Sequence, residues 1–276
     1  MDAAYFRSGG VVTAMHARKT AIVTGSATGV GAAVALMLAG GGWNVTINYS
    51  KSEREAKDSE ARCRAAGAET LLCQGDVSDD AACRRIVQST IQRWGRLDAL
   101  VNNAGVTTFV GSANWDALDA AAFARILGVN VVGSFQMLRA AAPHLKAGGD
   151  GAIVNISSIA GSQGIGSSVP YVASKGGVNA MTLHFARALA PQVRVNAVCP
   201  GMITTRWFTD GIGQEAYEKL KAGYEQTVPL ARACSAEDVA EAVVYLIGAR
   251  TVTGEVIDLD SGMHLGAMRA VVPPAR

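Results

Sequence analysis

The chain has 276 residues, of which 49% are hydrophobic and 17% charged, and its formal net charge is +2. This length fits one large domain with a sizeable core, and the 31 glycines suit a fold with many tight strand-to-helix turns. A nearly neutral chain without a basic stripe argues against nucleic acid as a partner. The five cysteines form no C-x-x-C pair and no spacing typical of metal ligands, so we expect free thiols and no metal.

The two ends of the chain show little periodicity. We expect an irregular extension at residues 1–18, one domain at 19–265 and a tail at 266–276. The first segment is either a loose extension or a consequence of the chosen start, since Met15 is an alternative. We recognise no secretory segment and no apolar run of about 18 residues. These features predict a cytoplasmic protein that has reduced thiols and no membrane partner.

A glycine-rich turn follows the first expected strand. Residues 20–24 are apolar and β-branched, and residues 29–40 form an apolar stretch of helical length. Between strand and helix, Gly25 permits a tight turn, Gly29 lets the backbone approach a phosphate, and Gly31 lets the helix pack on the strand. Backbone N–H groups in this order can face a pyrophosphate. The alternative is a glycine-rich turn without a ligand.

Short apolar runs alternate with longer stretches of helical pattern along the whole chain. This alternation predicts a doubly wound α/β fold, a parallel sheet of about seven strands with helices on both faces and right-handed crossovers. Serines 78 and 235 are expected to cap two of the helices. The expected strands are residues 20–24, 43–48, 69–73, 97–101, 152–157, 193–198 and 255–259, and the expected helices are 29–40, 52–66, 79–94, 116–146, 171–190 and 235–247.

The end of the second expected strand bears on the choice of a nucleotide. This strand ends at Tyr49 and continues with Ser50 and Lys51, without an acidic residue. NAD sites place a carboxylate there to accept from the ribose 2′-OH, whereas the 2′-phosphate of NADP needs a cation. We therefore favour NADP(H), with Ser50 and Lys51 at the 2′-phosphate, and keep NAD(H) as possible. The alternative for Lys51 is that it only caps a solvated loop.

Three residues form a candidate catalytic site. Tyr171 and Lys175 are four positions apart in an expected helix, so their side chains share one face. An ammonium near a tyrosine favours the phenolate and moves its pKa, ordinarily about 10, toward the neutral range. Ser158 follows the apolar run at 152–157, which places its hydroxyl at the carboxyl edge of the sheet. A Tyr–Lys pair is also common on ordinary helices, and a serine is common in turns.

These motifs resemble those of the short-chain dehydrogenase/reductase family in order and spacing. The resemblance covers residues 19–265 and is close to the 3-oxoacyl-carrier-protein reductase branch. It implies a single Rossmann-type domain, a homotetramer, and hydride transfer between a nicotinamide cofactor and a ketone, 3-oxoacyl compound or secondary alcohol. The matching motifs are the Thr24-Gly25-x-x-x-Gly29-x-Gly31 turn, Asn102-Asn-Ala-Gly105, Asn130, Ser158, Tyr171-x-x-x-Lys175, and Pro200-Gly201 with Thr205.

The resemblance implies a role for each matching residue. Tyr171 would be the general acid or base, Ser158 a second donor to the substrate oxygen, and Lys175 the group that lowers the tyrosine pKa and binds the nicotinamide ribose. Asn130 would hold a water that links Lys175 to solvent; it could also repair a helix kink. Asp76 resembles the acceptor of the adenine amino group, or is an acid at a helix N-terminus. The expected cofactor contacts are Gly25, Thr28, Gly29, Val30, Gly31, Tyr49, Ser50, Lys51, Asp76, Val77, Asn103, Ala104, Gly105, Tyr171, Lys175, Pro200, Gly201, Ile203 and Thr205.

The substrate region is the least specified. Residues 202–228 correspond to the variable substrate loop of the family, and Trp207 and Phe208 are either lid residues or ordinary packing. Arg206 touches either an acidic substrate or only solvent. The region before the fifth expected strand has few basic residues to dock an acidic carrier protein, so a small ketone or alcohol is at least as well supported. The expected substrate contacts are Ser158, Gly164, Trp207 and Phe208.

Three functions therefore remain open. The favoured one is an NADP(H)-dependent carbonyl reductase, with an NAD-dependent alcohol dehydrogenase as its close alternative. A nicotinamide-binding regulatory protein without turnover would be expected to lack Ser158, Tyr171 or Lys175, and all three are present. A relative that uses the same residues for dehydration or epimerisation would hold its cofactor tightly without net redox change.

Overall fold

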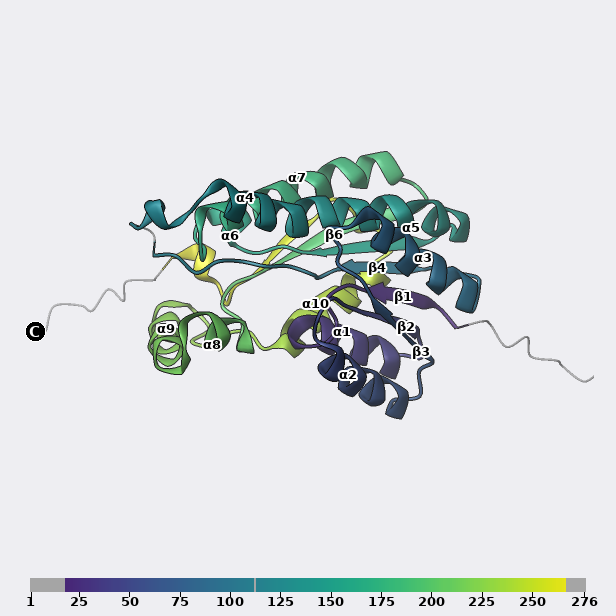
Figure 1. The fold of residues 1–276 in the computed structure, drawn as a ribbon, viewed down its shortest axis with the longest axis horizontal. Coiled ribbons are helices and arrows are strands. Elements are labelled where there is room, and N and C mark those ends of the chain that lie inside the picture. Colours follow the sequence, from purple (N-terminus) through teal and green to yellow (C-terminus); the bar gives the residue numbers. More distant parts are fainter. Residues whose placement is uncertain (1–17, 112, 267–276) are drawn as a thin grey trace, which may run out of the picture.

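The structure is a computed structural model and describes residues 18–111 and 113–266 (Figure 1). Within these residues, seven parallel strands form one sheet in the order β3-β2-β1-β4-β5-β6-β7. The strands are β1 (Thr20–Val23), β2 (Asn44–Tyr49), β3 (Thr70–Gln74), β4 (Ala99–Asn102), β5 (Gly151–Ile156), β6 (Val193–Pro200) and β7 (Val256–Leu259). The predicted doubly wound α/β fold is confirmed. The predicted extension and tail lie largely outside the described residues, and the domain limits stay a prediction.

Helices cover both faces of the sheet (Figure 1). One face carries α1 (Gly29–Gly40), α2 (Glu53–Ala65) and α10 (Ala236–Gly248); the other carries α3 (Asp80–Trp94), α4 (Ala120–Leu127), α5 (Ser134–Gly148) and α7 (Val169–Leu189). Three shorter helices, α6 (Ala160–Gln163), α8 (Arg206–Ile212) and α9 (Gln214–Thr227), follow the ends of β5 and β6. Single 3₁₀ turns occupy Trp115–Ala117 and Met263–Leu265.

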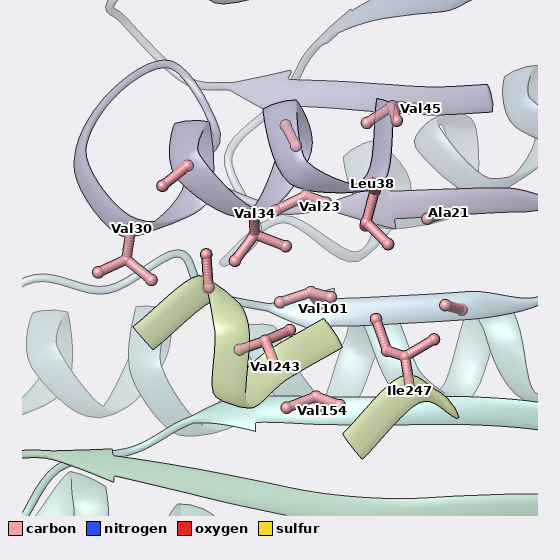
Figure 2. Packing of buried hydrophobic residues seen from close by; sticks show 14 of the residues in the cluster. Ala21, Val23, Val30, Val34, Leu38, Val45, Val101, Val154, Val243 and Ile247 are labelled. Carbon is pink, nitrogen blue, oxygen red and sulfur yellow. The ribbon is translucent and has the colours of Figure 1, made fainter. Parts of the chain in front are cut away.

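The core consists of aliphatic side chains on both sides of the sheet. Ala21 and Val23 of β1 belong to the cluster under α1 and α10, whereas Ile22 between them belongs to the cluster under α3 and α5. This alternation is the two-residue period of a strand, and a sheet buried on both faces explains its nearly continuous apolar runs. Figure 2 shows Val34 of α1 and Val243 of α10 in the first cluster, which also includes Val23 at the end of β1, just before the glycine turn. The core thereby fixes the turn in place.

The stretch predicted as one helix at 116–146 is divided into three parts. Asp119 caps α4, because its Oδ1 accepts from the backbone N–H of Ala122 at 2.7 Å, so the helix begins four residues later than predicted. A wide π-helical segment, Gly128–Gly133, then joins α4 to α5. At Gly133 a Cβ would lie 2.7 Å from Val77 Cγ2. The glycine therefore allows this wide turn to pack directly on the segment after β3.

The same stretch corrects the expectation that no apolar run of about 18 residues occurs. Residues 120–148 contain an 18-residue window with a mean hydropathy of 1.4, so the stretch is long and apolar enough to cross a membrane by length and composition alone. In the structure this stretch lies on the sheet, and Met137, Ala141 and Leu145 of α5 belong to the aliphatic core. Its apolar character is therefore that of a helix in the core of a globular domain.

Of the two predicted caps, one is confirmed. Ser235 and Asp238 form a reciprocal capping box at the start of α10, in which Ser235 Oγ accepts from the Asp238 N–H and the aspartate accepts from the Ser235 N–H. The expectation for Ser78 is wrong, because Asp79 caps α3 by accepting from the Ala81 N–H at 3.0 Å. Ser78 instead donates to Asp76 Oδ1 at 2.7 Å.

Candidate active site

A cavity of about 920 Å³ opens at the carboxyl edge of the sheet. Its floor is made by the ends of β1, β4, β5 and β6, and its outer wall by α8 and α9. Parallel sheets bind ligands at this edge, where the order of the strands reverses direction, here between β1 and β4. Most of the predicted site residues line the cavity: Gly25, Thr28, Gly29, Val30, Asn103, Ala104, Gly105, Ser158, Tyr171, Lys175, Pro200, Gly201, Ile203, Thr205, Trp207 and Phe208.

The glycine turn has the geometry that the sequence predicts. Gly25 and Gly29 have φ angles of +60° and +57°, a conformation that other residues rarely adopt. A Cβ on Gly31 would lie 2.5 Å from Gly25 O and from Asn103 Nδ2, so only glycine lets α1 start so close to the turn. Gly31 thus lies beneath the turn rather than in the cavity wall. The free N-terminus of α1 and this open cradle fit the pyrophosphate of a dinucleotide.

Three polar side chains tie the turn to the neighbouring strands. Thr24 Oγ1 accepts from the N–H groups of Asn103 and Ala104 at 2.9 and 3.0 Å, and Asn103 Nδ2 donates to the carbonyls of Thr24 and Gly25. On the other side, Asn48 Oδ1 accepts from the Gly25 N–H at 3.2 Å. The turn is therefore held in one conformation by β2 and by the segment after β4.

The residues predicted at the adenosine end lie outside the cavity wall. Tyr49 is buried, and Ser50 and Lys51 are exposed just after β2, where no carboxylate ends the strand. Asp76 is exposed, and its Oδ1 accepts from the Ser78 N–H, while Val77 is buried. These residues lie at the neighbouring ends of β2 and β3, as a dinucleotide lying across the sheet edge requires.

Tyr171 and Ser158 meet in the cavity. Tyr171 lies in the first turn of α7, and Ser158 follows β5. Burial raises the pKa of Tyr171 to about 12, and a hydrogen bond with Ser158 opposes this rise. Ser158 Oγ also accepts from the Ala160 N–H at 3.1 Å, which fixes its position at the strand end. The tyrosine is therefore a neutral phenol at physiological pH in the described structure.

Lys175 is buried beneath Tyr171. Its Nζ donates to the carbonyl of Ile156 at 2.7 Å and lies 5.6 Å from the centroid of the Tyr171 ring. Burial lowers the pKa of Lys175 to about 8. The predicted lowering of the tyrosine pKa by this ammonium is not observed. Desolvation of the phenol dominates, and the ammonium is directed to a strand carbonyl.

Asn130 occupies the centre of the π-helical segment and is almost fully buried. Its Oδ1 accepts from the Val106 N–H at 2.8 Å, and its Nδ2 donates to the Val106 carbonyl and to Ser174 Oγ. The side chain thus joins the segment after β4 to Ser174 of α7, the residue directly before Lys175. Asn130 therefore lies both in the irregular turn of the helix and next to the segment that carries Lys175. This position is compatible with a role in the helix kink and with a role beside Lys175.

The predicted substrate loop consists largely of the helices α8 and α9. The Trp207 ring lies 6.2 Å from the Tyr171 ring, and the Phe208 ring lies 5.8 Å from Phe109 and 6.4 Å from Tyr217. Trp207 and Phe208 line the cavity as predicted. Gly164 is exposed at the end of α6 and does not line the cavity. The residues of this stretch that line the cavity are the next three, Ile165, Gly166 and Ser167. Gly164 is therefore not placed at the substrate site.

The comparisons with known proteins agree with this geometry. The sequence profile described as "Enoyl-(Acyl carrier protein) reductase" matches residues 25–264. The crystal structure of a Burkholderia xenovorans protein assigned as a short-chain dehydrogenase/reductase superposes with a TM-score of 0.84 at 40% identity, over 91% of this chain and 100% of that one. The chain belongs to the short-chain dehydrogenase/reductase family. As a member, it is an oxidoreductase that uses a nicotinamide cofactor.

Other short-chain dehydrogenase/reductase relatives resemble the chain over most of its length. A Streptomyces violaceoruber protein assigned as ketoacyl reductase 2 of the granaticin polyketide synthase is 44% identical, over 89% of this chain and 96% of its own. The 3-oxoacyl-[acyl-carrier-protein] reductase FabG of Staphylococcus aureus is 33% identical, over 91% and 100%. The crystal structure of levodione reductase superposes with a TM-score of 0.81 at 28% identity, over 90% and 98%.

Several residues of this short-chain dehydrogenase/reductase site escaped the sequence analysis. Phe109 lies in an irregular segment after β4, and Leu220 and Met263 come from α9 and the last 3₁₀ turn. No local motif marks them, because their place depends on how α8 and α9 fold back over the sheet edge. The amphipathic pattern of α9 was a usable signal for Leu220. The pairing of Arg206 with Glu55, 151 positions away, left no signal in the sequence.

Proposed function

We propose that this protein reduces a ketone or 3-oxoacyl compound to the alcohol, with NADPH as the hydride donor. The observation that carries the proposal is that Ser158, Tyr171 and Lys175 line the same cavity as the phosphate-binding turn. The relatives named as ketoacyl and 3-oxoacyl reductases support the substrate class. A bound nicotinamide would supply the hydride.

The side chains then handle the charge that develops on the substrate. A carbonyl oxygen that receives hydride at its carbon becomes an alkoxide and needs a proton and a second hydrogen-bond donor. Tyr171 gives up its phenolic proton to this oxygen, and Ser158 donates the second hydrogen bond. Because burial raises its pKa, Tyr171 is protonated near neutral pH and can serve as the proton donor that reduction requires. Lys175 and Asn130 lie beneath Tyr171, on the side from which the phenol would regain its proton.

The preference for NADP(H) rests on the end of β2. Ser50 and Lys51 are exposed there, and no carboxylate is present to accept from a ribose 2′-OH. Lys51 would meet the 2′-phosphate as a point charge, and Asp76 would accept from the adenine amino group. An NAD-dependent alcohol dehydrogenase is the alternative, and it predicts equal or tighter binding of NADH.

The cavity wall is mainly apolar, with Ile165, Trp207 and Leu220 among its members, which supports an uncharged ketone at least as well as a carrier-bound acyl chain. By resemblance to the family we also propose a homotetramer in the cytoplasm.

Fluorescence titration with NADPH and NADH tests the cofactor proposal. We expect NADPH to bind at least about tenfold more tightly to the wild type, and Lys51→Ala to remove most of that difference. Lys146→Ala, an exposed lysine at the far end of α5, is the matched control and leaves the ratio unchanged. If NADH binds as tightly as NADPH, the role given to Ser50 and Lys51 is wrong. A panel of ketones and acyl thioesters with the preferred cofactor then tests reduction itself.

A further inference from the structure

Arg206 connects the two sides of the cavity. It is the first residue of α8, and its Nη1 lies 3.3 Å from Glu55 Oε1 on α2, the helix that follows the end of β2. Its Nε also lies 3.7 Å from Asp210 Oδ2, one turn along α8. The guanidinium thus reaches from the substrate lid to the helix beside the adenosine end. Two carboxylates offset its charge in the described structure.

The position of Arg206 relates it to the phosphate turn. Arg206 lines the cavity together with Thr28 and Gly29. The preceding residue, Thr205, has its Cγ2 3.8 Å from the place where a Cβ of Gly29 would lie. The start of α8 therefore packs against the turn at the N-terminus of α1, where a dinucleotide brings its phosphates.

We propose that Arg206 is a ligand for a phosphate of the dinucleotide and that Glu55 holds it until the cofactor binds. This inference rests on the nicotinamide cofactor of the proposed function. The Arg206–Glu55 pair is half-exposed, with 49% and 30% of the two side chains accessible, so water and salt weaken it. A phosphate offers the guanidinium a negatively charged partner that accepts two parallel hydrogen bonds, which is the stronger alternative. Cofactor binding then exchanges the carboxylate for the phosphate.

This exchange links cofactor binding to the substrate lid. Trp207 and Phe208 follow Arg206 directly in α8, and the Trp207 ring packs 6.2 Å from that of Tyr171. When Arg206 turns from Glu55 to a phosphate, α8 loses its tie to α2 and becomes tied to the cofactor instead. The position of α8 over the substrate end then depends on whether the cofactor is bound.

The experiment measures cofactor affinity, not turnover. Dissociation constants for NADPH and NADH are determined by fluorescence titration for wild type, Arg206→Gln, Glu55→Gln and the double variant. Glu53→Gln is the matched control, because it removes one negative charge from the same helix, and Glu53 pairs with Lys57 rather than Arg206. Circular dichroism melts show that each variant folds.

The proposal predicts changes of opposite sign. Arg206→Gln should weaken binding about tenfold, whereas Glu55→Gln should tighten it about two- to fivefold, beyond any effect of Glu53→Gln. The double variant should bind like Arg206→Gln, because Glu55 acts only through the arginine. Equal weakening for both cofactors assigns Arg206 to the pyrophosphate, and weakening for NADPH alone assigns it to the 2′-phosphate.

Other results would overturn the inference. If wild type binds cofactor and neither substitution changes the dissociation constants, the pair is an ordinary surface ion pair, and the proposed function stands without it. If Glu55→Gln weakens binding as much as Arg206→Gln, the intact pair itself is what supports the site. If wild type binds neither cofactor, this inference and the proposed function both fail.

Discussion

Lys175 is expected to destabilise the folded protein near neutral pH. Its side chain is almost fully buried, and burial lowers its pKa from the ordinary 10.5 to about 8. The two pKa values differ by about 2.5, and each pH unit corresponds to about 1.4 kcal/mol, so the buried ammonium costs on the order of 3 kcal/mol below pH 8. Between pH 8 and 10.5 the unfolded chain binds more protons than the folded one, so this contribution makes stability rise with pH.

Replacing the ammonium removes this pH dependence. Lys175→Met keeps an unbranched side chain of similar length, and it leaves the Ile156 carbonyl without its donor, a loss of about 1–3 kcal/mol that does not depend on pH. The free energy of unfolding of the variant minus that of wild type should therefore fall by about 2–3 kcal/mol between pH 7 and pH 10. Urea unfolding, followed by circular dichroism at several pH values, measures this difference.

A control separates burial from loss of charge. Lys51→Met removes one positive charge at an exposed position, so any general effect of net charge appears in both variants. If the difference between Lys175→Met and wild type stays constant from pH 7 to pH 10, the ammonium of Lys175 is not disfavoured by burial, and the reasoning about its environment is refuted.

Three further substitutions test the packing around the site. Gly31→Ala should destabilise the protein by about 1–3 kcal/mol, because its Cβ would meet Gly25 O and Asn103 Nδ2 at 2.5 Å. The control Gly128→Ala, whose Cβ would have no heavy atom within 4 Å, should change stability little. Equal melting temperatures for Gly31→Ala and Gly128→Ala in thermal scans would contradict the prediction. Arg194→Met should lower the urea midpoint by the equivalent of at least about 2 kcal/mol, since the buried guanidinium donates to three carbonyls at the end of α10; an unchanged midpoint would show that water replaces it. Tyr224→Phe removes the hydroxyl that donates a hydrogen bond to the Asp260 carbonyl at 2.6 Å, and it should speed tryptic cleavage within α9. An unchanged rate of cleavage would show that this hydrogen bond does not hold α9 in place.

The sheet could be predicted because it depends on local patterns. Buried strands have continuous apolar runs, and every strand lies within two residues of its expected limits. The glycine turn was equally accessible, since Gly25, Gly29 and Gly31 satisfy steric requirements that only glycine meets. The positive φ angles of Gly25 and Gly29 belong to the local backbone geometry, whereas the close approach of Gly31 to Asn103 is seen only in the structure.

Features that depend on packing between distant segments could not be predicted. The π-helical segment around Asn130 packs against Val77 through Gly133, and nothing in the apolar pattern of that stretch shows this contact. The direction in which the pKa of Tyr171 is shifted also depends on burial, and the Tyr-x-x-x-Lys spacing gives no information about burial. Spacing placed the two side chains together, but only the structure shows that burial is the main influence on the pKa of Tyr171.

The most direct test of the proposed chemistry is the effect of Tyr171→Phe on ketone reduction. The rate of NADPH oxidation with a reactive ketone is compared for wild type, Tyr171→Phe and the control Tyr245→Phe, which is exposed on α10. We predict that Tyr171→Phe lowers kcat at least about 100-fold while the dissociation constant for cofactor changes less than about twofold, because only the proton donor is lost. If Tyr171→Phe keeps more than about a tenth of the wild-type kcat, Tyr171 does not donate the proton and the proposed mechanism is contradicted.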